Sequence, residues 1–377
     1  MNAITPEVDT GTKSARVATS NSATVADRTL VSVIIPNFNF AEFVGQAIDS
    51  ALALDWPAVE VIVVDDGSTD SSRSVIENYG DRVVAIFTEN RGQKAAYNEG
   101  FSRSSGEVVI FLDSDDMLEP TLIEELMTVW RPGISKVQFQ MKVVDAGGTP
   151  TGALLPQYHV PPTVAEVRLW ARTAAAYPTP PGSGNAYSRA YLQKIFPLEG
   201  PDRIADSQCL AAAPFLGDVV TIAKPLVMYR VHGRNQGAMS ELDPARIGRE
   251  LERARNRFRY GQSIARDAGI SVSDAALDHS LEFLPYRLAS LKLAPEAHPI
   301  DADDTAKVLR SFVEACFVPQ GVPIRSRATL LVWAAAVAFA PARIGNQLVL
   351  WRFASGSRPK LLNKVLRAFR VVKRPES

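Results

Sequence analysis

The sequence has few cysteines, no recognisable secretion signal and no apolar run long enough to cross a bilayer. Its two cysteines, Cys209 and Cys316, exclude a disulfide framework or a zinc cluster and suit a reducing compartment. Residues 1–29 are rich in Ser, Thr, Ala and Val but lack the apolar segment of a signal peptide, so we expect a flexible leader. The uncharged run 328–342 falls short of the ~20 residues that a transmembrane helix needs.

The formal net charge is zero, but the charged residues are unevenly distributed along the chain. The 41 basic residues balance the 41 acidic ones, yet eleven basic residues and a single acid, Glu376, lie between Arg325 and the end. The rest of the chain is therefore clearly acidic, which argues against nucleic-acid binding by the main body. The remaining composition, with 46% hydrophobic residues, is that of a globular protein with room for two domains.

From Val31 onward, apolar runs alternate with segments of helical periodicity. This alternation predicts an α/β fold with right-handed crossovers and a mostly parallel sheet. The predicted strands are 31–35, 59–64, 82–87 and 108–112, and the predicted helices are 40–54, one that begins near Asp70, and 92–104.

Beyond residue 130 the pattern is less regular. We expect a strand at 136–145, a loop-rich stretch at 150–185 around a helix near 163–176, and two apolar runs at 219–223 and 226–231. After residue 241 the sequence becomes helical, charged and rich in alanine. The expected organisation is a leader at 1–29, an α/β domain at 30–240, a helical subdomain at 241–324 and a basic tail at 325–377.

The segment EVVIFLDSDD (107–116) is an apolar strand that ends in three carboxylates, Asp113, Asp115 and Asp116. Side chains at the carboxyl end of such a strand face the crevice where open α/β sheets bind ligands. Three adjacent carboxylates repel one another unless a hard cation offsets their charge. The segment is therefore either a metal site or a solvated turn that caps the next helix.

Three other segments end strands in the same way. They are IIPNFN (34–39), VVDDGSTD (63–70) and NRGQKAAYNEG (90–100), which precede FLDSDD (111–116). Each alone is an ordinary turn, but the four in this order and spacing are specific. Together they resemble the inverting glycosyltransferases of family 2, which have the GT-A fold, a Rossmann-like, mostly parallel sheet with flanking helices. The resemblance covers about residues 30–235, and a helical C-terminal region would follow it.

The resemblance implies a nucleotide-sugar donor site and a DxD motif, Asp113-Ser114-Asp115. Asp115 would bind Mn²⁺ or Mg²⁺, while Asp113 would contact the sugar or ribose and would also be a ligand of the metal. Asp66 would hydrogen-bond the base or ribose, and Asp65 would support its turn. The remaining implied donor-binding residues are Pro36, Asn37, Asn39, Gly92 and Lys94.

The family pattern also implies two residues further along. Asp206 would be the general base, although Ala205 stands where the family usually has Glu, and Asp202 is the alternative base. His232, in the segment PLVMYRVHGRNQGA (225–238), would be the third metal ligand. The alternatives are an Asp that merely stabilises a helix N-terminus and a His on the polar surface.

These parts imply transfer of a sugar, expected to come from a UDP-sugar, to a hydroxyl of a glycan or lipid-linked glycan in envelope or exopolysaccharide synthesis. The metal would neutralise the diphosphate leaving group, and Asp206 would supply general-base catalysis of ~10²–10⁴-fold.

One alternative is a synthase that places sugar on polyprenyl phosphate. Another is a nucleotidyltransferase, which would not require Asp206 or His232. A third is a non-catalytic scaffold that binds nucleotide sugars, against which the retained motif acids argue.

The tail adds a membrane prediction. Residues 361–374, LLNKVLRAFRVVKR, place leucine, valine and phenylalanine on one helix face and most of the basic residues on the other. Basic amphipathic helices of this type lie in the membrane interface and favour anionic lipid. We therefore expect a cytoplasmic protein that binds the cytoplasmic face of the inner membrane. A core-packed helix with a solvated basic face, or a protein-partner site, is the alternative.

Overall fold

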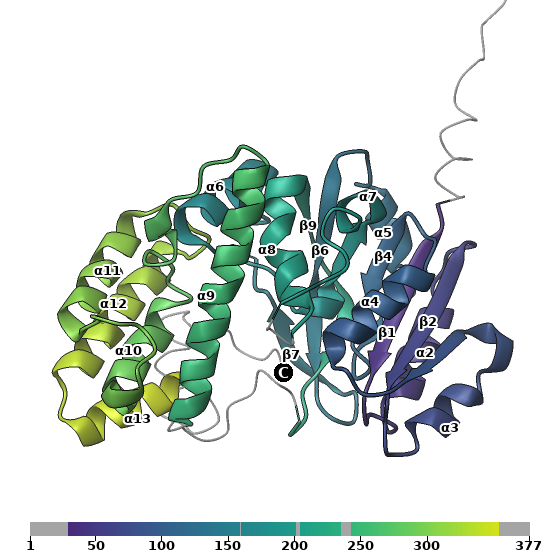
Figure 1. The fold of residues 1–377 in the computed structure, drawn as a ribbon, viewed down its shortest axis with the longest axis horizontal. Helices are drawn as coiled ribbons and strands as arrows, with labels where there is room; N and C mark the ends of the chain where they lie inside the picture. Colours follow the sequence, from purple (N-terminus) through teal and green to yellow (C-terminus); the bar gives the residue numbers. More distant parts are fainter. Residues whose placement is uncertain (1–28, 159, 201–203, 235–242, 354–377) are drawn as a thin grey trace, which may run out of the picture.

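The computed structural model describes residues 29–158, 160–200, 204–234 and 243–353, in which one mixed sheet is flanked by helices and joined to a helical region (Figure 1). Within these residues the sheet has nine strands, ordered β3-β2-β1-β4-β8-β6-β9-β5, with β7 paired to β6. The leader, Asp202 and the amphipathic segment 361–374 lie outside the described residues.

The first half of the sheet is parallel, as predicted. It contains β1 (Val31–Asn37), β2 (Val59–Asp66), β3 (Val84–Thr88) and β4 (Val108–Phe111). Every residue of β1 and β4 is buried, because helices cover both faces of the sheet. On one face pack α2 (Val44–Leu52) and α3 (Ser72–Glu77), and on the other packs α4 (Gln93–Arg103).

The second half of the sheet is mixed. Its central strand, β6 (Ile134–Val144), is antiparallel to β7 (Pro150–Leu155) and β8 (Asn185–Ser188) and parallel to β9 (Asp218–Arg230). The short β5 (Met117–Leu118) pairs with the far edge of β9. The helices of this half are α5 (Leu122–Met127), α6 (Val164–Ala174), α7 (Arg189–Leu192) and α8 (Asp206–Leu216).

Two expectations for this half were wrong. The runs 219–223 and 226–231 belong to one strand, because Lys224-Pro225 lies at an irregularity where the register passes from Phe139–Ile222 to Gln140–Pro225. A proline is tolerated at such a point since no regular ladder bond is lost. The stretch 150–185 is less loop-rich than expected, because β7 pairs with β6 within it.

The helical region has its own apolar core. It contains α9 (Pro244–Asp267), α10 (Leu284–Leu293), α11 (Thr305–Phe317), α12 (Ile324–Phe339) and α13 (Ala342–Phe353). Leu330, Ala334 and Val337 of α12 and Val349 of α13 share this core with α10 and α11. Residues 325–353, assigned to the basic tail from the sequence, are therefore integral to the helical region.

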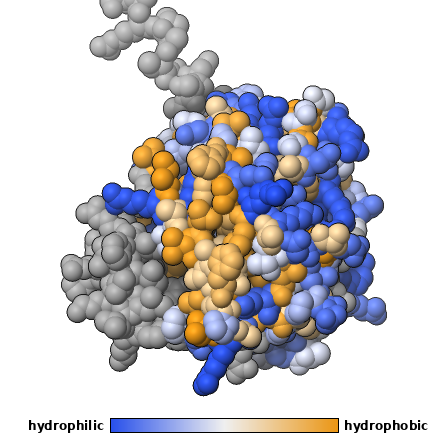
Figure 2. All heavy atoms as spheres, turned by 90° about the vertical axis from the view of Figure 1, so that its left-hand side faces the viewer, coloured by the Kyte–Doolittle hydropathy of each residue, from blue (hydrophilic) through white to orange (hydrophobic). Residues whose placement is uncertain are grey.

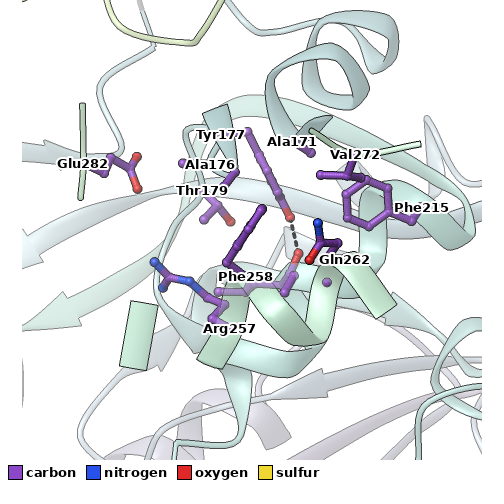
Figure 3. Close-up of a pocket in the computed structure, with 14 residues that line it drawn as sticks. Ala171, Ala176, Tyr177, Thr179, Phe215, Arg257, Phe258, Gln262, Val272 and Glu282 are labelled. Atoms are coloured by element: carbon purple, nitrogen blue, oxygen red, sulfur yellow. Dashed lines mark hydrogen bonds between the residues drawn. The ribbon is translucent and has the colours of Figure 1, made fainter. Parts of the chain in front are cut away.

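The helical region meets the sheet domain along α8 and α9. A cavity of about 70 Å³ remains at this junction, lined by Leu210 and Phe215 of α8, Phe258 of α9 and Tyr177 (Figure 3). The Tyr177 hydroxyl donates to the Leu210 carbonyl at 2.7 Å, so its polar group is satisfied. Sites for small molecules usually have roughly 300 Å³ or more, and this cavity is therefore a packing gap.

A buried ion pair braces the helical core. The guanidinium of Arg287 donates to both oxygens of Asp303 at 2.5 and 2.7 Å, and to Asp278 at 2.6 Å. The side chains of Arg287 and Asp303 are 2% and 0% exposed. Hydrogen bonds from Arg287 and His298 hold the pKa of Asp303 below its ordinary value, against the opposing effect of burial.

We predict that Asp303→Ala lowers the free energy of unfolding of the helical region by about 3 kcal/mol, because the buried guanidinium of Arg287 loses two of its charge-assisted hydrogen bonds and keeps only the one to Asp278. The neighbouring Asp304 accepts from the Lys307 amide as the N-cap of α11. Asp304→Ala is therefore a matched control that should cost only about 1 kcal/mol. Urea unfolding followed by circular dichroism measures both values. Equal losses would contradict a special role for the ion pair.

Candidate active site

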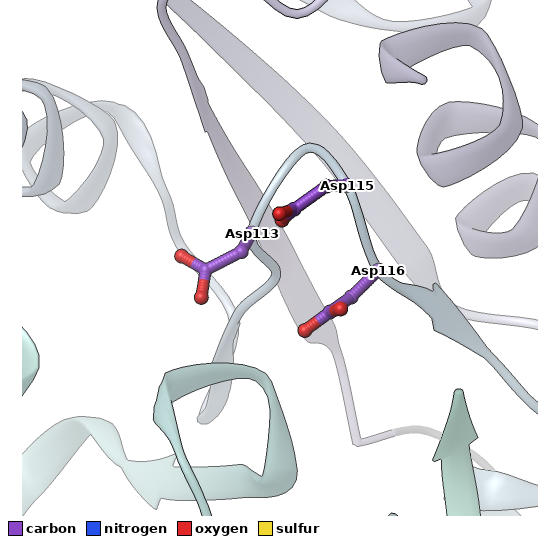
Figure 4. Close-up of side chains that lie close together, drawn as sticks. All are labelled: Asp113, Asp115 and Asp116. Atoms are coloured by element: carbon purple, nitrogen blue, oxygen red, sulfur yellow. The ribbon is translucent and has the colours of Figure 1, made fainter. Parts of the chain in front are cut away.

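Three carboxylates cluster where β4 ends. Asp113, Asp115 and Asp116 each offer an oxygen, and these oxygens lie within 4.8 Å of one another (Figure 4). The turn that presents them is held by the Asp116 amide, which donates to the Asp113 carbonyl at 3.0 Å. The Asp113 amide donates to the hydroxyl of buried Ser183 at 3.1 Å. The strand thus delivers all three acids to the crevice, as the sequence predicts.

Crowding and burial make this cluster electrostatically unfavourable by itself. Loss of water contact raises the pKa of Asp113 well above its ordinary value, and Asp115, Asp116 and Asp206 raise it further. Burial, followed by the charge of Asp115, raises the pKa of Asp116 to about 8. Asp116 Oδ1 accepts from the Arg230 amide at 2.9 Å, whereas its buried Oδ2 has no hydrogen-bond partner in the described structure.

The donor set fits a divalent cation. Mg²⁺ and Mn²⁺ favour carboxylate oxygens, and a buried carboxylate oxygen without a partner is the kind of group that a cation would satisfy. Asp113 and Asp115 were named from the sequence as ligands. Asp116, noted there only as part of the acidic turn, joins them as a candidate ligand.

His232 lies against this cluster. Its Nε2 is 2.9 Å from Asp115 Oδ2, and its Nδ1 accepts from the Arg234 amide at 3.1 Å. Because Nδ1 accepts, the neutral ring carries its proton on Nε2 and donates to Asp115. The ring also stacks on Phe43, with 5.0 Å between centroids. His232 is therefore beside the predicted metal ligand, and its own ligation of the metal stays a prediction.

Arg230 holds the turn 113–116 in place. This side chain is 1% exposed, and its Nε donates to the Asp115 carbonyl at 2.9 Å. Its two terminal nitrogens donate to the Ala146 carbonyl and to Gln46 Oε1, each at 2.8 Å. One guanidinium thus joins the end of β9, the acidic turn and α2. Arg230 lies in the segment 225–238, in which only His232 had a predicted role.

Asp206 faces the acidic cluster across a glycine. A Cβ atom at Gly182 would lie 3.5 Å from Asp113 Oδ2 and 3.6 Å from Asp206 Oδ2. It would also lie 3.3 Å from the Tyr97 hydroxyl. Asp206 is the first residue of α8, as predicted. Gly182 thus leaves open the space on which Asp113, Asp206 and Tyr97 converge.

The helix α4 connects these two sides of the crevice. Gln93 donates to Asp113 Oδ1 at 3.4 Å and accepts from the Ala205 amide, next to Asp206, at 3.2 Å. Lys94 Nζ donates to the Glu199 carbonyl at 2.9 Å and to the Gly200 carbonyl at 3.2 Å. These contacts position the segment before α8. Contact between Lys94 and a nucleotide stays a prediction.

The other predicted donor-binding residues lie along the carboxyl edge of β1 and β2. Pro36 is buried and pairs in register with Val64. Asn37 donates to Asp65 Oδ1 at 2.8 Å, and Asp65 also accepts from the Ser68 hydroxyl at 2.5 Å. Asp65 thus supports the turn after β2.

Asn39 and Asp66 fix the two loops at this edge. Asn39 has a positive φ of 59°, and its Oδ1 accepts from the Thr69 amide at 2.7 Å. Asp66 accepts from the amides of Arg91 at 2.9 Å and Gly92 at 2.7 Å. Gly92 has a φ of +90°, a conformation that favours glycine, and it precedes α4. Asp66 therefore ties β2 to the loop that begins α4.

Two buried polar residues near Asp206 were missed from the sequence. The Tyr97 hydroxyl has no hydrogen-bond partner in the described structure, and its ring stacks on Phe111 at 4.0 Å. Lys136 of β6 is fully buried, and its Nζ donates to Thr179 Oγ1 at 2.8 Å. Burial lowers the pKa of Lys136 well below its ordinary value, and the charge of Asp206 partly opposes this shift. The alternation Lys136, Gln138, Gln140 along one strand face was the available signal.

Comparison with known proteins agrees with this geometry. The model of the family "Glycosyl transferase family 2" matches residues 32–196. An uncharacterized glycosyltransferase of Nostoc sp. is 38% identical over 213 residues, which are 54% of this chain and 66% of the relative. Residues 32–196 are therefore a glycosyltransferase family 2 domain.

Other relatives match a shorter part. An uncharacterized glycosyltransferase of Rickettsia typhi is 40% identical over 100 residues, which cover 26% of this chain and 31% of that protein. The matches thus span less than two thirds of these relatives' lengths. Among solved structures, S. aureus TarS 1–349 in complex with UDP-GlcNAc has a TM-score of 0.52 at 18% identity. That match covers 86% of this chain and 91% of TarS 1–349, and it shows the GT-A fold.

The raised pKa values predict how the metal-free family 2 domain responds to pH. Because folding raises the pKa of Asp116 to about 8, its stabilising contribution is complete below pH ~4 and is lost as pH rises through 8. We expect the melting temperature in EDTA to fall by several degrees between pH 5 and pH 8.5. Mn²⁺ should remove most of this fall.

The isosteric variant Asp116→Asn is the control for other titrating groups, because it keeps an oxygen for the Arg230 amide. Its melting temperature in EDTA should depend less on pH than that of the wild type. The same pH dependence in both proteins would contradict the assignment to Asp116.

Proposed function

We propose that this protein is a metal-dependent inverting glycosyltransferase that moves a sugar from a nucleotide sugar, a UDP-sugar by preference, to an acceptor hydroxyl. The observation that carries the proposal is the approach of Asp206 to Asp113 across Gly182, beside the cluster of three carboxylates. A candidate base and a candidate metal site therefore share one crevice.

The carboxylates of Asp113, Asp115 and Asp116 would hold Mn²⁺ or Mg²⁺, with His232 next to them. When bound, the cation would neutralise charge on the departing diphosphate. Arg230 supports the same turn by its bond to the Asp115 carbonyl, and it would keep the ligand oxygens in place. In this arrangement the bound cation would supply the positive charge that the donor phosphates need, and the protein would supply rigidly held ligands for that cation.

Asp206 would accept the proton of the acceptor hydroxyl. Attack by that oxygen on the anomeric carbon, from the side opposite the diphosphate, forms the new glycosidic bond and breaks the old one with inversion. The N-terminus of α8 favours the ionised carboxylate that this role requires.

The carboxyl edge of β1 and β2 would bind the nucleotide. Asn37, Asn39, Asp66 and Gly92 lie there on turns fixed by hydrogen bonds. The fold is shared with TarS, which was crystallised with UDP-GlcNAc, and this supports a nucleotide sugar as donor and UDP as its nucleotide.

The acceptor would be a glycan or a lipid-linked glycan of an envelope or exported polysaccharide. A lipid-linked acceptor suits the basic amphipathic sequence 361–374, which would hold the enzyme at the cytoplasmic face of the inner membrane. Of the helices in the described ranges, none has the length and apolar character required to cross a membrane.

We predict that Asp206→Asn reduces sugar transfer by ~10²–10⁴-fold and leaves donor affinity nearly unchanged, because only the proton acceptor is lost. Asp115→Asn should abolish the metal-dependent part of donor binding. Thermal-shift titration with UDP-sugars, with and without Mn²⁺, measures binding, and release of UDP in the presence of candidate acceptors measures turnover.

Asp81→Asn, an exposed substitution of the same chemistry on the segment Gly80–Arg82, is the matched control and should change neither quantity. Loss of binding in Asp206→Asn would indicate a structural role for this residue. Metal-dependent binding that survives in Asp115→Asn would contradict the metal site.

A further inference from the structure

The outer surface of the helical region is unusually apolar. Among the described residues, twelve large apolar side chains are exposed, and six of them lie on α11, α12 or α13. They are Val313, Phe317, Ile324, Val332, Phe339 and Ile344. Figure 2 shows hydrophobic spheres running along this side of the molecule, which α11 and α12 form in Figure 1. Contiguous exposed apolar surface of this kind marks an interaction site.

Helix α12 provides the centre of this surface. Its fully exposed apolar positions recur every three or four residues, which places them on one face of the helix. They are Ile324, Ala328, Val332, Ala336 and Phe339, called here the α12 stripe. The opposite face, with Leu330, Ala334 and Val337, packs into the helical core. A helix that is apolar on every side is normally covered on every side, and none of the described residues covers the α12 stripe.

The loop beside the stripe is rigidly built. The guanidinium of Arg327 donates to the carbonyls of Cys316, Val318, Gln320 and Val322 at 2.7–2.9 Å. These bonds close the connection between α11 and α12, at whose ends Phe317 and Ile324 are 83% and 81% exposed. Since the backbone is fixed, the outward position of both side chains is a property of the fold.

The charges around the stripe identify its partner. No acidic residue occurs between Glu314 and the last described residue, Phe353, while this interval holds four arginines. Arg325 and Arg343 are exposed next to the two ends of the α12 stripe. An apolar stripe with a basic border complements a bilayer surface that contains anionic lipid. Two copies of this chain joined through the same face would instead bring basic border against basic border.

We propose that the α12 stripe, together with Phe317 at the end of α11, is a membrane-docking face that inserts Phe317, Ile324, Val332 and Phe339 into the interface of an anionic bilayer. This inference extends the proposed membrane contact from the tail to the folded domain, and it does not depend on the transferase reaction. Helix α12 would lie in the plane of the membrane, because its exposed residues extend along its whole length. The domain then has a fixed orientation on the lipid surface.

The test is cosedimentation of the full chain with two kinds of vesicle, phosphatidylcholine alone and phosphatidylcholine with phosphatidylglycerol. The wild type should bind the anionic vesicles at least ten times more strongly than the neutral ones. The double variant Val332→Glu/Phe339→Glu should lose at least ten-fold of this binding. Val84→Glu, on the exposed side of β3, is the matched control and should bind as the wild type does.

Circular dichroism melting and donor binding, measured on the same samples, report whether each variant is folded and keeps its donor site. A folded double variant that binds vesicles as well as the wild type would overturn the proposal, because the tail alone would then suffice. Wild-type protein that ignores anionic vesicles would overturn it as well. So would a wild-type dimer in sedimentation velocity that the double variant converts to monomer, since the partner would then be a second copy.

Discussion

The rest of the site depends on one electrostatic constraint, the concentration of carboxylates at the end of β4. Three acids in one turn, with Asp206 opposite, repel one another in a crevice that water reaches poorly. The surrounding structure holds them there through Arg230, which donates to the Asp115 carbonyl, and through Ser183, which accepts from the Asp113 amide. The repulsion between these carboxylates lowers the stability of the folded protein, but the same carboxylates are suited to binding a cation. Function is thus favoured here at the expense of stability.

A second constraint is that both sides of the crevice are fastened to α4. Gln93 contacts Asp113 and the start of α8, while Lys94 binds carbonyls of the preceding segment. The close packing of Gly100 against Ile34 and Val64 holds the same helix on the sheet. The acids and the candidate base thus share one support, although their positions in the chain are about ninety residues apart.

Much of this could be predicted from the sequence where local pattern and position agree. The parallel half of the sheet was predictable because its strands are buried on both faces and end in polar turns, and Asp206 was predictable because its motif opens a helix. Tyr97 and the support by Arg230 were not predictable, because their roles arise from contacts between distant segments, and Lys136 was indicated only by the polar alternation along β6. The boundary at residue 325 was misjudged since basic charge was read as tail character, whereas Leu330, Ala334 and Val337 pack into the helical core.

The pair of amide bonds to Asp66 has a consequence for the order of events. Asp66 holds the loop at Arg91 and Gly92, and this loop leads directly into α4. The first residue of α4, Gln93, contacts both Asp113 and the N-terminus of α8. A ligand that binds this loop would therefore affect the position of Gln93. Through Gln93 it would affect the positions of Asp113 and of Asp206, the candidate base. We expect the enzyme to follow a compulsory sequence, in which the donor enters first and completes the site that the acceptor then meets.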